Sequence, residues 1–99
     1  MPYIDNDRRQ TINHATDGMI DSLIDDLGTL FGGDLNYLVT SLVHQWVISR
    51  GAPSYATLSA GHSVLCDATA EYYRTVMAPY ENLKIKQNGR VSTLDEGTY

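Results

Sequence analysis

The chain has 99 residues, of which 42% are hydrophobic and 19% charged, a composition typical of one folded domain. Its formal net charge of −5 disfavours nucleic acid as a partner, because phosphate backbones attract proteins rich in lysine and arginine. The single cysteine, Cys66, rules out an intramolecular disulfide and fits a reducing compartment. No apolar run approaches the roughly 20 residues that span a bilayer, and the first 20 residues do not resemble a signal peptide. We therefore expect no membrane partner and a location in the cytoplasm or in a particle.

The apolar residues repeat at helical spacing, and the first predicted helix runs from about residue 8 to residue 27. Asp7 is its expected N-cap, at the start of a capping-box spacing. Apolar side chains then recur on one side at 100° per residue. Gly28 fits the left-handed position that ends many helices. Residues 1–6 would form an extended N-terminal arm, pinned to this helix by Tyr3 and its neighbour.

The second predicted helix begins with Asp34 as its N-cap and ends near Arg50, before a glycine and a proline. Its main apolar stripe includes Trp46, which we expect in the core with Leu42 and Leu65 nearby. The opposite side also carries apolar residues. A helix that is apolar on two sides is usually central or lies at an interface.

A third helix is predicted from Ser54, as N-cap, to Met77, and Pro79 then opens a short fourth one. Residues 92–99 have no helical period and are expected to form a mobile C-terminal tail beyond a helical domain of residues 1–91. The sequence thus predicts an all-α fold. We expect a small antiparallel bundle of three main helices plus a short fourth, with extended N- and C-terminal arms.

Five short motifs occur in a fixed order along the chain. They are MPYI at residues 1–4, GDLNY at 33–37, EYYR at 71–74, APYE at 78–81 and KIKQNG at 84–89. In this order they resemble a family of short proteins of tailed bacteriophages and prophages, with a DUF6899-like domain of unknown function. The resemblance implies a viral origin and no particular reaction. The chain departs from the family pattern at Arg90, at Thr75 and in the extension over residues 92–99.

Three aspartates, Asp17, Asp21 and Asp25, recur every four residues on the polar side of the first predicted helix. Like charges at this spacing are mildly destabilising. The stripe is either a solvated face or a docking site for a basic partner, for example Lys84, Lys86 and Arg90 of a second copy. A solvated face is the commoner reason for such a stripe.

His62 and Cys66 lie four residues apart, a spacing that can bring two metal ligands together. A structural zinc site needs four ligands, however, and the sequence has no second pair. A hydrogen-bonded histidine beside a buried thiol is the simpler interpretation. No nucleophile motif, phosphate-binding loop or dinucleotide fingerprint accompanies these residues. We therefore predict no catalytic residue, no metal ligand and no cofactor.

Tyr37, His44 and Ile48 fall on one side of the second predicted helix, opposite its main stripe. We expect this side to be a contact face, covered either by another part of the chain or by a second copy. Tyrosine is frequent, with seven residues against one phenylalanine. Such amphipathic side chains favour surfaces that a partner covers, although they also pack against helix ends.

The leading functional hypothesis is a non-enzymatic phage accessory protein in the host cytoplasm. It would act by stoichiometric binding, inhibiting or sequestering a host or phage protein or a small host ligand, as a homo-oligomer. The alternatives are a virion or assembly component of a tailed phage and, as a third option, a small enzyme. The candidate binding residues are Tyr37, His44, Ile48, Tyr80, Glu81, Lys84, Lys86, Asn88, Asp17, Asp21 and Asp25.

Overall fold

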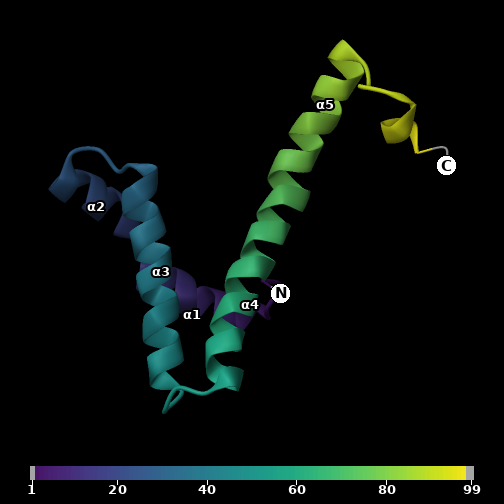
Figure 1. Cartoon of the computed structure of the whole chain (residues 1–99). Coiled ribbons are helices and arrows are strands. Elements are labelled where there is room, and N and C mark those ends of the chain that lie inside the picture. Colours follow the sequence, from purple (N-terminus) through teal and green to yellow (C-terminus); the bar gives the residue numbers. More distant parts are fainter. Residues whose placement is uncertain (1, 98–99) are drawn as a thin grey trace. The chain divides into compact units, whose positions relative to one another are not determined.

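The structure is a computed structural model that describes residues 2–97. It is 79% helix, and the described residues contain no strand, so the predicted all-α class is confirmed. Figure 1 shows the elements in order. They are α1 (Asn6–Thr16), α2 (Met19–Leu27), α3 (Gly32–Ser49), α4 (Tyr55–Tyr72), the π-helical segment η1 (Tyr73–Met77), α5 (Ala78–Asn88) and the 3₁₀ helix η2 (Thr93–Glu96).

The chain divides into two compact units, Met1–Leu65 and Cys66–Tyr99. The first unit holds α1, α2, α3 and the first part of α4. The second holds the rest of α4 together with η1, α5 and η2. None of the helices within residues 2–97 is long and apolar enough to cross a membrane.

The first predicted helix is two helices, which corrects the single helix expected over residues 8–27. Asp17 leaves the helical region with ψ 130°, and Gly18 adopts a left-handed φ of +70°, so the helical hydrogen bonds stop between α1 and α2. The N-cap also differs from the prediction. Asp5, and not Asp7, accepts the hydrogen bond from the Arg8 N–H at 2.9 Å.

Helix α3 begins three residues earlier than expected, because the residue predicted as its N-cap has another role. Phe31 is the N-cap, and Asp34 stands in the first turn, where its carboxylate accepts a hydrogen bond from the Phe31 N–H at 2.9 Å. At its other end α3 stops at Ser49, and Gly51 has a φ of +110° that admits the turn into α4. The predicted end of the second helix, near Arg50, is confirmed.

Helix α4 starts where the sequence predicts. The Thr57 N–H donates to Ser54 Oγ at 3.2 Å, and the Ser54 N–H donates to Thr57 Oγ1 at 2.9 Å. This reciprocal pair is a capping box with threonine in place of the usual glutamate. It fixes the first turn of α4 immediately after the chain has left α3.

Helices α4 and α5 are joined by η1 without an intervening loop residue. Pro79 lies in the first turn of α5 and has no N–H to donate. The Ala78 N–H donates to the carbonyl of Tyr73, five residues back, which is the hydrogen bond of a π-helix. The proline stands in the first turn of a new α-helix, α5, but the backbone remains helical from α4 through η1, so the separate start predicted for a short fourth helix is a widened turn and not a break.

The C-terminal tail is not wholly irregular, which corrects part of the prediction for residues 92–99. Ser92 Oγ accepts from the Leu94 N–H at 3.1 Å. The Asp95 carboxylate accepts from the N–H groups of Val91 and Ser92 at 3.0 and 3.1 Å. These bonds hold the single turn of η2. Residues 98 and 99 lie outside the described part of the chain, as does Met1 of the MPYI motif.

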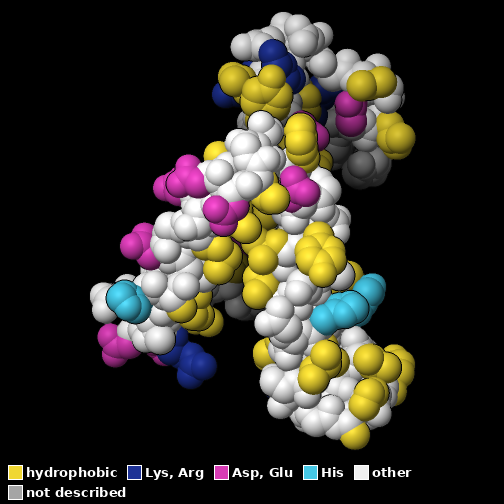
Figure 2. All heavy atoms as spheres, turned by 90° about the vertical axis from the view of Figure 1, so that its left-hand side faces the viewer, with side chains coloured by type: hydrophobic (Ala, Val, Ile, Leu, Met, Phe, Trp, Pro, Cys, Tyr) yellow, Lys and Arg dark blue, Asp and Glu magenta, His cyan; other side chains and the backbone are white. Residues whose placement is uncertain are grey.

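Residues 2–97 contain no large apolar side chain that is fully buried. Hydrophobic side chains, coloured yellow, are accordingly visible on the face shown in Figure 2. Trp46 is 38% exposed, with the Arg50 guanidinium 4.9 Å from its ring centre, so its predicted place in a core is wrong for the single chain. Tyr3 is 54% exposed, with the guanidinium carbon of Arg9 in α1 6.0 Å from its ring centre.

Candidate functional site

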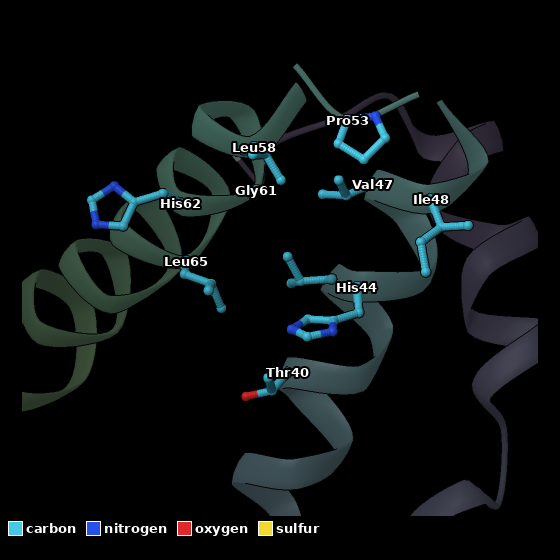
Figure 3. A pocket seen from close by; sticks show the side chains of 10 residues that line it. Thr40, His44, Val47, Ile48, Pro53, Leu58, Gly61, His62 and Leu65 are labelled. Atoms are coloured by element: carbon cyan, nitrogen blue, oxygen red, sulfur yellow. The ribbon is translucent and has the colours of Figure 1, made fainter. Parts of the chain in front are cut away.

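Helices α3 and α4 enclose an open apolar groove, here called the α3–α4 groove, which lies entirely in the first unit (Figure 3). Its volume is about 370 Å³. The residues that line it come from α3, from the connection after it and from the first half of α4. They are Thr40, Val43, His44, Val47, Ile48, Pro53, Leu58, Gly61, His62 and Leu65.

At the floor of the groove the two helices approach closely at Gly61. Gly61 is the one fully buried residue among residues 2–97. A Cβ atom added to it would stand 2.9 Å from Val47 Cγ2 and 3.3 Å from Val43 Cγ1, which is too close for a normal contact. The absence of a side chain at Gly61 therefore allows α4 to pack against the two valines of α3.

The walls above this floor are mostly apolar and lie open to solvent. His44, Val47, Leu58 and Leu65 point into the space between the helices (Figure 3). Leu58 is 57% exposed, and Ile48, at the rim, is 73% exposed. Exposed apolar side chains gathered on one concave surface are typical of a binding site that a partner covers.

The groove lining contains no acidic residue, lysine or arginine, although the chain as a whole has a net charge of −5. His44 points into the groove, whereas His62 points away from it on the other side of α4 (Figure 3). The polar groups that face a ligand are therefore few, with Thr40 and His44 the main ones.

The predicted contact face of α3 is divided between two places. His44 and Ile48 line the α3–α4 groove, as described above. Tyr37 lines a different hollow, formed with Leu23 and Leu27 of α2, and is itself 76% exposed. The three residues share one side of α3, but the neighbouring helix differs along its length, so they do not form one site.

The three aspartates predicted as a stripe are also divided. Asp17 ends α1, whereas Asp21 and Asp25 lie in α2. Because Asp17 and Gly18 leave the right-handed helical conformation, the i, i+4 spacing no longer places Asp17 on the same helix face as Asp21 and Asp25. Asp17 and Asp21 still line one shallow polar hollow around Gly18. Two of the three aspartates, Asp21 and Asp25, therefore lie on one helix, and the predicted continuous stripe of three is wrong.

In the second unit, three of the predicted binding residues of α5 contact other residues of η1 or α5. The Tyr73 hydroxyl donates to Glu81 Oε2 at 2.7 Å, and this bond together with the carboxylate charge raises the pKa of Tyr73. Lys84 Nζ lies 5.6 Å from the ring centre of Tyr80 and 3.4 Å from Gln87 Oε1. Glu81 and Lys84 are therefore already engaged in hydrogen bonds within the second unit. These bonds stabilise η1 and α5 and leave fewer groups available to a partner.

The remaining predicted residues, Lys86 and Asn88, lie exposed at the end of α5, where Gly89 follows with a φ of +86°. A cation in the last turn is favourable because of the helix dipole, which accounts for Lys86 without a partner. Within residues 2–97 no three His, Cys, Asp or Glu side chains come together as a possible metal site. His62 and Cys66 both take part in other interactions.

The profile described as Domain of unknown function (DUF6899) matches residues 1–91. The chain belongs to this family. The match covers every residue of the α3–α4 groove and confirms the family-level resemblance drawn from the motifs. The search among curated proteins and the search among solved structures gave no match.

Sequence reasoning missed most of the groove. Of the residues that line it, the sequence predicts only His44 and Ile48 as binding residues, because the spacing of Val43, Val47 and Leu58 is that of any apolar helix stripe. One signal was available. An isolated glycine inside a helical pattern, as at Gly61, often marks a close approach of two backbones.

Proposed function

We propose that this protein is a bacteriophage accessory protein that acts by stoichiometric binding in the host cytoplasm, without catalysing a reaction. It would inhibit or sequester a host protein or a small host ligand, and it would work as a homo-oligomer. The observation that carries the proposal is the exposure of the apolar surface. Of the described residues, 2–97, no large hydrophobic side chain is fully buried.

Stability supports a form in which this surface is covered. Burial of apolar area is the main favourable contribution to folding, and helices of 9 to 18 residues, as α2 and α3 are, are marginal in water without packing partners. A protein that leaves its apolar stripes open is therefore suited to meet another surface. In that assembly we expect the antiparallel bundle that the sequence predicts.

The chemistry of the α3–α4 groove favours a protein partner over a charged metabolite. Its lining offers Thr40 and His44 as the main polar groups that face inward and has no fixed charge. Recognition of phosphate or carboxylate needs cations or several aligned N–H donors. Apolar side chains of a partner, in contrast, would be matched by Val47, Leu58 and Leu65.

The proposal can be tested by locating the protein during infection. Quantitative mass spectrometry of purified particles, compared with infected-cell lysate, is expected to find the chain in the lysate and only in traces in the particle. A fixed stoichiometric copy number in the particle would overturn the accessory role and would support the alternative, a virion or assembly component. The native mass of the isolated protein, measured in the same preparation, tests the oligomer separately.

A further inference from the structure

We propose that the α3–α4 groove is the surface on which a second copy of this chain docks, so that two first units pair groove to groove around a two-fold axis. This inference rests on the proposed function only in its claim that the protein works as an oligomer. It adds the surface, the occupant and the residues that carry the contact.

The exposure of the groove lining indicates which surface a partner has to cover. Two of the large apolar side chains that line it, Ile48 and Leu58, are 73% and 57% exposed. Apolar side chains gathered on one surface and left open to solvent favour association, and the interfaces of obligate homo-oligomers resemble a domain core cut in half.

Charge favours a second copy at this particular surface. Two chains that each carry −5 repel one another unless they meet through an uncharged patch, because like charges brought together at an interface are costly. The groove lining contains no Asp, Glu, Lys or Arg. A two-fold axis places a surface against itself, so an uncharged apolar surface is the one that can pair with its own copy.

The α3–α4 groove is open enough to receive side chains of a second copy. Gly61 leaves the floor of the groove without a side chain, and Val43 and Val47 close it from the other helix. Leu58 projects into the opening, whereas Ile48, at the edge of the groove, lies on the flank of α3 that is turned away from α4 (Figure 3) and is 73% exposed. When two grooves meet, the exposed Ile48 at the edge of each groove can pack against apolar side chains of the other copy, and apolar atoms that now face water become buried.

The first experiment compares the native mass of three proteins over a range of concentrations. Ile48→Glu places a charge in the proposed contact. Leu94→Glu is the matched control, because Leu94 is 71% exposed and lies in η2 of the second unit, outside the groove. Since both side chains are largely solvent-exposed in the single chain, neither change is expected to reduce helicity in circular dichroism. We expect the wild type and the control to be oligomeric and Ile48→Glu to dissociate with a Kd raised about 100-fold or more, the size of a hot-spot effect.

The second experiment separates a direct contact from general destabilisation. Ile48→Glu and Ile48→Arg are each expected to be monomeric alone, because like charges would be buried across the axis. Mixed in equal amounts, they are expected to form a 1:1 complex of mixed mass, because opposite charges compensate one another in the shared groove. A misfolded variant would not be rescued in this way.

Three results would overturn the proposal. One is a wild-type protein that remains monomeric at a chain concentration about 100-fold above a micromolar Kd. That result would mean that the chain covers its own groove. Another is an oligomer that survives Ile48→Glu but is lost in Leu94→Glu. The last is a mixture of the two Ile48 variants that stays monomeric. Because these measurements use the isolated protein, they can fail while the accessory role stands, and the particle measurement can fail while the pairing stands.

Discussion

Gly61→Ala tests the close approach of α3 and α4 on which the groove depends. Two effects of opposite sign compete. In an exposed helix, replacing glycine by alanine stabilises by about 1 kcal/mol, because the glycine backbone loses more entropy on folding. At Gly61 the new Cβ would lie 2.9 Å from Val47 Cγ2 and 3.3 Å from Val43 Cγ1. Overpacking of this kind typically costs about 1–3 kcal/mol, so the helix gain is cancelled or exceeded.

The matched control for this change is Gly33→Ala. Gly33 lies in the first turn of α3, has no left-handed φ, and has open space where a Cβ would stand. Alanine there is expected to stabilise by about 0.5–1 kcal/mol. The two variants should therefore differ in free energy of unfolding by about 1–3 kcal/mol, with Gly61→Ala the less stable.

Urea unfolding followed by circular dichroism measures both variants, at one chain concentration because any oligomer makes stability depend on concentration. The valine methyls are attached close to the α3 backbone, so they cannot move aside as the end of a long side chain could. If Gly61→Ala gains as much stability as Gly33→Ala, the two helices do not meet at this glycine, and the account of the groove floor is refuted.

Three further predictions concern local interactions. Ser54→Ala should lower the free energy of unfolding by about 1 kcal/mol in the same urea assay, because it removes one half of the capping box with Thr57; an unchanged midpoint would contradict the cap. Hydrogen bonds from two backbone N–H groups lower the pKa of Asp95 in the folded chain. The ionised carboxylate therefore stabilises η2 fully at a pH above the pKa of Asp95 in the unfolded chain. This stabilisation is lost as the pH falls through the lower pKa of the folded chain. Amide NMR signals of η2 should then shift only at low pH and, in Asp95→Asn, should lose that titration. The hydrogen bond to Glu81 and the charge of its carboxylate raise the pKa of Tyr73. The bond therefore persists below the pKa of Tyr73 in the unfolded chain and breaks as the pH rises through the higher pKa of the folded chain. Ultraviolet titration of Glu81→Gln should show a phenol that ionises at lower pH than in the wild type.

Helix ends follow from signals within a few residues, and several could be read directly. The cap at Ser54 and the stops at Gly28, Gly51 and Gly89 depend on local hydrogen bonds and on the φ angles that glycine permits. Competing local signals were harder to rank. Asp5 and Asp7 are both suitable N-caps, and the sequence gives no reason for Asp5 to be the one that accepts the Arg8 N–H.

The break at Gly18 shows how a local preference can be misjudged. Its neighbours have a clear helical period, and a single glycine inside such a pattern is usually tolerated. In the structure Asp17 and Gly18 leave the helix together. The apolar residues on both sides keep the same period, so periodicity alone could not reveal that the helix was interrupted.

The amino-acid sequence by itself determined the helical class, the family and several helix ends, because these depend on residues near one another in the chain. The groove depended on the tertiary structure. Val43 and Val47 look the same in the sequence whether they face a core, a second helix or solvent, and only the approach of Gly61 distinguishes them. Trp46 gives a second example. It lies on an apolar helix stripe, which predicts a place in the core, but it is 38% exposed because no other segment of the chain covers it fully. Burial arises from contacts between distant segments, and a periodic pattern gives the side of a helix but not the partner that covers it.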